Sequence, residues 1–164
     1  MNVFFKTTLG SFTLELNKKK CPITVKNFVH YIENEFYIDT IFHRVIKGFM
    51  IQGGGFDENM IEKKTNEPIH NEAKNGISNT KYTISMARTS EPHSATSQFF
   101  INSVDNLFLN HTSESPQGFG YCAFGTVVND TSTIDKISNV ATQSIFPHDD
   151  VPVEPIIILN ANIL

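Results

Sequence analysis

The chain has 164 residues, a formal net charge of -4 and a hydrophobic content of 40%, with 14 Phe and no Trp. A charged content of 18% is too low for a disordered chain, and this length allows a sizeable core. We therefore expect a soluble globular protein with a single domain over residues 1–164. The sequence has no dense basic stripe and no apolar run near the ~20 residues of a membrane helix, so we expect neither nucleic acid nor a membrane as partner.

The N-terminus and the cysteines predict a cytoplasmic location. The first residues contain no long apolar stretch followed by a small-residue cleavage site, so we expect no secretory signal. Cys21 and Cys122 are too few and too far apart in sequence to indicate a disulfide framework. No Cys/His spacing is typical of a zinc site. A reducing compartment fits this pattern best.

A hairpin and a helix are predicted at the start of the chain. Residues Val3–Thr7 and Phe12–Leu16 alternate apolar and polar side chains around Leu9-Gly10, as paired strands do. Pro22 then opens a segment with one apolar face, which predicts a helix packed on a sheet. The residues of that face are Val25, Phe28, Val29 and Ile32.

The next segment, Ile41–Gly55, has the sequence IFHRVIKGFMIQGGG and sets polar side chains in what is otherwise a buried sheet pattern. The guanidinium of Arg44 cannot lose its charge, so among these apolar neighbours it must find an acceptor or lie in a cleft. Lys47-Gly48 interrupts the run, which predicts two strands joined by a tight connection. The glycines Gly53–Gly55 lack the lysine and the following helix of a phosphate loop, and they indicate a close backbone approach instead.

Alternation along the second of these strands predicts Met50 and Gln52 on one face, with Phe49 and Ile51 on the other unless a bulge intervenes. Two readings of the segment follow. In one, it is a core hairpin with a buried arginine stem and a hydrogen-bonded histidine. In the other, five residues border one pocket with an apolar floor: His43, Arg44, Phe49, Met50 and Gln52.

The remainder of the chain predicts loops, short strands and one more helix. Residues Phe56–Asn79 are polar and without period, so we expect long surface loops that wall a groove. Four strands and a short helix are expected, with a single turn at Asn106–Asn110; the strands are Ile84–Arg88, Gln98–Asn102, Tyr121–Val128 and Pro155–Asn162, and the helix is Thr131–Asn139. Many short strands with two helices predict a closed antiparallel barrel.

Four segments together resemble the cyclophilins, the peptidyl-prolyl cis-trans isomerases, and most closely the cytosolic bacterial type known as peptidyl-prolyl isomerase B. They are FHRVIKGFMIQGG, NEPIHNEAKNGISNTKYTISMAR, SATSQFFIN and FGYCAFGTVV, in the family's order and over nearly the whole chain. The resemblance implies a mainly β, closed eight-stranded antiparallel barrel capped by two helices, with the groove outside its wall. It also implies a monomer without cofactor or metal, acting on proline-containing peptides and on unfolded or partly folded proteins.

Catalysis of rotation about an X-Pro bond needs no covalent chemistry. The barrier of ~18–20 kcal/mol comes from sharing of the nitrogen lone pair with the carbonyl, so a catalyst has only to favour the twisted amide. It can donate a hydrogen bond to the prolyl nitrogen, hold a carbonyl and shelter the ring from water. A fixed arginine suits this task, and we expect Arg44 to be the donor and Gln52 a second anchor.

The remaining site residues follow from the resemblance. It implies a proline pocket of Phe49, Met50, Phe100 and Leu109, a groove histidine at His43, and peptide-backbone contacts at Ala87, Arg88 and Gln98. Phe108 stands where eukaryotic members carry tryptophan, and Tyr121 where they carry histidine, with Tyr121 covering the proline ring. The missing indole donor predicts weak cyclosporin binding. Arg88 replaces a smaller polar residue, which predicts a preference for acidic residues before proline.

Other functions are weighed against this one. A proline-peptide binding module or holdase would keep the groove and act through occupancy alone. A barrel holding a ligand in its lumen is disfavoured, because bulky Phe and Ile side chains should fill a small barrel. A hydrolase triad at His93, Ser94 and Ser97 lacks an acidic partner. Two further sets are expected to be inert: the histidines His30, His70, His111 and His148, and the acidic cluster Asp149, Asp150 and Glu154, expected in a solvated loop.

Overall fold

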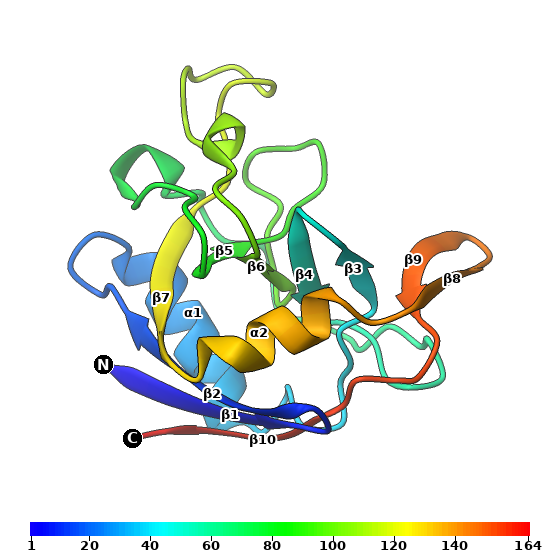
Figure 1. The fold of residues 1–164 in the computed structure, drawn as a ribbon. Coiled ribbons are helices and arrows are strands. Elements are labelled where there is room, and N and C mark those ends of the chain that lie inside the picture. The colour runs from blue at the N-terminus through cyan, green and yellow to red at the C-terminus, as the bar shows by residue number, and fades with distance from the viewer.

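The computed structural model describes residues 1–164, apart from the side chain of Asn75. Its centre is one eight-stranded antiparallel sheet in the order β10-β1-β2-β7-β5-β6-β4-β3, accompanied by two α-helices (Figure 1). The strands are β1 (Asn2–Thr7), β2 (Gly10–Leu16), β3 (Arg44–Ile46), β4 (Met50–Gly53), β5 (Thr83–Met86), β6 (Phe99–Asn102), β7 (Ala123–Asn129) and β10 (Ile158–Ile163). The prediction of a mainly β fold with eight such strands is confirmed.

The sheet curls into a half-barrel and does not close completely, so the predicted closed barrel overstated its closure. Its edge strands are β3 and β10, and the segments that precede them meet at an isolated bridge between Ile41 and Ile157. The amide of Phe42 donates to the carbonyl of Ile156 at 3.0 Å. Beyond this point β10 pairs with β1, whereas β3, which is only three residues long, pairs with β4. No continuous ladder therefore joins β3 to β10.

Two helices pack on the sheet as predicted. Helix α1 (Pro22–Glu33) begins at a proline, whose fixed φ suits the first helical turn, and it buries Phe28 against Phe99 and Phe124 with ring centroids 5.6 and 5.1 Å apart. Helix α2 (Thr131–Ser138) buries its own short apolar face. The concave side of the sheet is therefore filled by side chains.

Alternation sends the other side chains of the central strands outward. In β6, Phe99 and Ile101 join the main core, while Phe100 belongs to a separate small cluster on the opposite face. In β4, Ile51 points to the core and Met50 to that second cluster. The strand period of two thus divides one apolar sequence run between the core and an outer surface.

One hairpin was not predicted. Strands β8 (Thr142–Ile145) and β9 (His148–Pro152) form a two-stranded sheet beside β3 (Figure 1). Asp149 and Asp150 lie in β9 and not in the loop that we expected. The residues of β8 are all exposed, so no alternation of apolar side chains marks this pair in the sequence. In the described part of the chain, no helix has the length and apolar character that a membrane crossing requires.

Candidate active site

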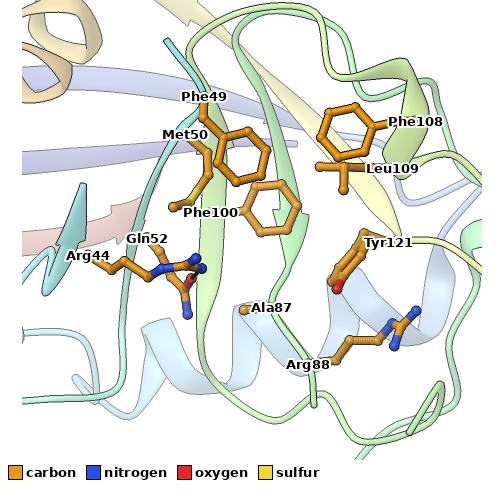
Figure 2. A pocket seen from close by; sticks show the side chains of 10 residues that line it. All are labelled: Arg44, Phe49, Met50, Gln52, Ala87, Arg88, Phe100, Phe108, Leu109 and Tyr121. Carbon is orange, nitrogen blue, oxygen red and sulfur yellow. Dashed lines mark hydrogen bonds between the residues drawn. The ribbon is translucent and has the colours of Figure 1, made fainter. Parts of the chain in front are cut away.

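The structure brings ten of the twelve predicted site residues around one pocket of about 340 Å³ on the outer face of β4 and β6 (Figure 2). Short 3-10 helix η2 (Leu107–Leu109) and the segment before β7 complete its wall. The lining residues are Arg44, Phe49, Met50, Gln52, Ala87, Arg88, Phe100, Phe108, Leu109 and Tyr121.

Arg44 and Gln52 form the polar side of the pocket. They are direct cross-strand partners in the β3–β4 register, so their side chains leave the sheet on the same face. Arg44 Nη1 donates to Gln52 Oε1 at 3.2 Å, and Gln52 Nε2 donates to Gln98 Oε1 at 3.0 Å. Within the described residues the one ion pair, Lys74 with Glu114, does not involve Arg44. The guanidinium is therefore oriented by a neutral amide and keeps its other donors for a ligand.

The apolar floor lies beside this row. Met50, Phe100 and Leu109 are buried and form a cluster separate from the main core. Phe49 and Phe108 stack at the rim with ring centroids 5.9 Å apart, and Phe108 is 74% exposed. Phe108 therefore offers an apolar surface to whatever enters the pocket.

Tyr121 closes the far side of the pocket. Its ring meets Phe100 edge-on with centroids 5.7 Å apart. The Arg88 guanidinium lies over the face of the Tyr121 ring, 4.4 Å from its centroid. Arg88 Nε donates to the Gly120 carbonyl at 3.1 Å and Nη1 to the Thr89 carbonyl at 2.9 Å. These contacts fix a second positive charge at the groove, again on neutral acceptors.

Gln98, the eleventh predicted residue, lines a neighbouring cavity of about 210 Å³. Gln52, Ala87 and Arg88 line both cavities, so the two adjoin. The glycines after β4 bring the backbone close to Gln98: a Cβ added at Gly55 would lie 2.5 Å from Gln98 Cγ. This is the close backbone approach that the sequence indicated.

The structure does not bring His43, the twelfth residue, to the pocket. Its ring is 5% exposed, packs 4.6 Å from the ring of Phe56 and lies 6.4 Å from that of His148. Its neighbour Arg44 faces the groove, and adjacent residues in extended chain point to opposite sides. Burial, then His148 and Arg44, lowers the pKa of His43 to about 4, and its Nδ1 has no hydrogen-bond partner within the described structure.

The predicted face of Phe49 is also corrected. Strand alternation alone set Phe49 opposite Met50 unless a bulge intervened, whereas the resemblance set both residues in the proline pocket. Phe49 packs with Met50 on the groove side. Phe49 precedes β4 and follows Gly48, whose φ of +72° turns the chain. Strand alternation does not extend into such a turn.

Sequence reasoning missed a set of buried asparagines that holds the groove backbone. Asn106 Nδ2 donates to the Phe49 carbonyl at 2.9 Å and to Asn102 Oδ1 at 2.8 Å. Asn79 Nδ2 donates to the Tyr121 carbonyl at 3.1 Å, and Asn102 Nδ2 donates to Asn79 Oδ1 at 3.1 Å. One continuous network thus joins the two ends of the pocket. An asparagine within the apolar strand QFFIN was the available signal.

Comparisons with known proteins agree with this geometry. Residues 2–163 match the family model described as cyclophilin type peptidyl-prolyl cis-trans isomerase/CLD. Peptidyl-prolyl cis-trans isomerase B of Escherichia coli (strain K12) is 56% identical over 95% of both chains. An isomerase of Streptomyces antibioticus is 53% identical over 99% of this chain and 98% of its own. The crystal structure of a Cryptosporidium parvum cyclophilin type isomerase in the presence of dipeptide Ala-Pro has a TM-score of 0.77 and 27% identity, covering 100% of this chain and 99% of that one.

Proposed function

The chain belongs to the cyclophilin-type peptidyl-prolyl cis-trans isomerases, and from this premise we propose that Arg44 carries its catalysis of rotation about X-Pro bonds. The observation that supports Arg44 most is the guanidinium held by Gln52 at 3.2 Å beside the cluster of Met50, Phe100 and Leu109. The cation suits the carbonyl and nitrogen of a prolyl residue, and the apolar floor suits its ring.

The proposed mechanism is non-covalent. The proline ring lies on the apolar floor under Tyr121, and Arg44 donates to the proline carbonyl and toward the prolyl nitrogen. As the amide twists, the lone pair returns to that nitrogen, which then accepts a hydrogen bond better than it does in the flat amide. Arg44 therefore binds the twisted state more tightly than either planar isomer, which lowers the barrier.

Gln52 is proposed to hold Arg44 and a substrate carbonyl in register. One N–H of its amide donates to Gln98 and its oxygen accepts from the guanidinium, so the second N–H is the group that donates to the substrate carbonyl. Ala87, Arg88 and Gln98 border the adjoining cavity and are proposed to bind the extended peptide before the proline. This division places the bond to be twisted at the boundary between the two cavities.

The proposed substrates are proline-containing peptides and unfolded or partly folded proteins. The pocket is open to solvent at the exposed Phe108, so a proline within a longer chain can enter it. The Ala-Pro dipeptide of the Cryptosporidium parvum structure supports the same class of ligand. We propose in addition a cytoplasmic location, supported by the two free thiols, and a single domain, supported by the pairing of the first strand with the last.

Exchange spectroscopy on a small panel of Ala-Pro, Glu-Pro and Lys-Pro peptides tests this proposal. We expect catalytic amounts of the protein to speed exchange between the cis and trans proline signals. A protein that only binds would broaden or shift these signals without speeding exchange. That result would exclude isomerisation and favour a binding module.

A further inference from the structure

Two buried thiols lie in contact behind the groove and take no part in the proposed isomerisation. Cys21 directly precedes α1 and Cys122 directly precedes β7, 101 positions apart in the chain. Both are free and buried, and their Sγ atoms are 3.7 Å apart. A disulfide of about 2.05 Å therefore needs the sulfurs to approach by about 1.7 Å, through rotation of the side chains together with a small shift of the Cys122 backbone.

The two thiols differ in their surroundings. The pKa of Cys122 is lowered by its hydrogen bond with the Cys21 sulfur and by a second hydrogen bond with the Thr24 hydroxyl, although burial opposes this effect. The contact between the two sulfurs, together with burial, raises the pKa of Cys21. Cys122 is thus the better nucleophile of the pair, since the thiolate is the reactive form.

Cys122 is also the more accessible of the pair. It lines a small cavity of about 10 Å³, room for one molecule the size of water. Buried Thr24 and Asn71 form part of the wall, and the exposed His70 with the half-buried Arg88 form the part nearest the surface. Cys21 does not border this cavity. An oxidant that approaches from this side therefore meets the sulfur of Cys122 before that of Cys21.

We propose that Cys21 and Cys122 form an oxidisable dithiol site that closes to an intramolecular disulfide with a peroxide. The Cys122 thiolate attacks one peroxide oxygen, the O–O bond breaks, and the departing hydroxide takes a proton to become water. The Cys21 sulfur then attacks the sulfenic sulfur of Cys122, loses its thiol proton and displaces hydroxide, which takes that proton and leaves as a second water. Two thiols are oxidised and one hydrogen peroxide is reduced to two waters.

The disulfide joins the start of α1 to the segment that carries Tyr121. Tyr121 directly precedes Cys122, and the Cys122 carbonyl accepts a hydrogen bond from the Met86 amide at 3.1 Å. Closure of the S–S bond moves Cys122 toward α1 and displaces the tyrosine that covers the pocket. Oxidation therefore lowers kcat/KM several-fold, a consequence that rests on the proposed function.

The test uses the full reduced chain treated with hydrogen peroxide. We expect the intact mass to fall by two hydrogen atoms, and a non-reducing peptide map to link the Cys21 and Cys122 peptides. Dithiothreitol should reverse both changes. Two thiols that remain alkylatable after unfolding, or disulfides that form only between molecules, would overturn the proposal.

Single variants test the order of events. In Cys21→Ala, dimedone should trap a sulfenic acid at Cys122. In Cys122→Ala, Cys21 should be oxidised at least about tenfold more slowly, because its thiol has neither the lowered pKa nor the cavity. Equal oxidation of both single thiols would contradict the assignment of Cys122 as nucleophile. Circular dichroism checks that each variant is folded, and the wild-type peptide map decides on the disulfide without them.

The coupling to the groove has a separate readout. Because the kcat/KM of the reduced enzyme is measured first, absence of isomerase activity is recognised before oxidation begins. We expect peroxide to lower kcat/KM in the wild type and to leave the Cys21→Ala protein much less affected. A linked disulfide with unchanged kcat/KM would overturn the coupling.

Discussion

Replacing Arg44 by alanine removes the cation that Gln52 holds beside the apolar floor. A fixed hydrogen-bond donor aimed at charge that develops in a transition state is worth about 2.7–4 kcal/mol, or 10²–10³ in rate. Arg44 is exposed at the mouth of an open groove, where solvent weakens its field. We therefore expect the lower end of that range, a loss of about 100-fold in kcat/KM.

The same geometry predicts little loss of stability in this variant. The only side chain to which Arg44 is hydrogen-bonded in the described structure is Gln52, and an exposed residue of this kind contributes about 0.5 kcal/mol or less to the free energy of unfolding. Arg44→Lys keeps the charge but loses the planar fork that reaches Gln52 and a substrate together, so it should recover little activity.

A protease-coupled assay on an Ala-Pro peptide measures the loss, and urea unfolding confirms the fold. Lys47→Ala is the matched control, because Lys47 is an exposed cation in the turn of the same hairpin but does not line the pocket. We expect its kcat/KM to equal that of the wild type. An Arg44→Ala enzyme whose kcat/KM stays within about threefold of the wild type would refute the reasoning.

Four further predictions concern the rest of the site. Phe100→Ala should lower kcat/KM and destabilise the fold by about 3 kcal/mol in urea unfolding, because it removes part of the buried floor. Phe100→Leu should lose less activity and less stability, and equal losses in the two variants would be inconsistent with a packed floor. Arg88→Gln should reduce the ratio of kcat/KM for Glu-Pro over Lys-Pro peptides several-fold while Arg88→Lys retains it, and an unchanged ratio would remove Arg88 as a determinant of charge preference. His43 has a folded pKa of about 4 against 6.5 when unfolded, so between these pH values the unfolded state binds more protons, and the free energy of unfolding should fall by about 3 kcal/mol as the pH drops from 6.5 to 4. Urea unfolding across this range should show a flatter pH profile for His43→Phe than for the wild type, and identical profiles would contradict the shift. Phe108→Trp should tighten cyclosporin binding in a fluorescence titration by supplying the missing donor, while Phe108→Leu should not; equal affinities would show that the donor is not what limits binding.

Local patterns in the sequence were sufficient for most individual elements. The apolar spacing after Pro22 predicts α1, and alternation on either side of Leu9-Gly10 predicts the β1–β2 hairpin, because both patterns come from residues close together in the chain. The pairing of β6 with both β4 and β5 joins segments that no local pattern relates. Family resemblance supplied the barrel and the common pocket of Phe100 and Met50, but not this strand order.

The failures have physical causes of the same kind. The hairpin of β8 and β9 carries few buried side chains, so its strands leave no apolar period to recognise. His43 was placed in the groove with Arg44 because the resemblance implied a groove histidine there, although neighbours in extended chain face opposite ways. The asparagine network was missed because Asn79, Asn102 and Asn106 act through contacts between separate segments.

The most direct test of the central claim separates binding from isomerisation in Arg44→Ala. The Kd for an Ala-Pro peptide and the cis-trans exchange rate at saturating enzyme are measured for this variant and for the wild type. If Arg44 favours the twisted amide, exchange on the enzyme falls about 100-fold while Kd changes less than about threefold. A variant that binds the peptide about 100-fold more weakly but exchanges it at the wild-type rate when saturated would show that Arg44 only binds the ground state.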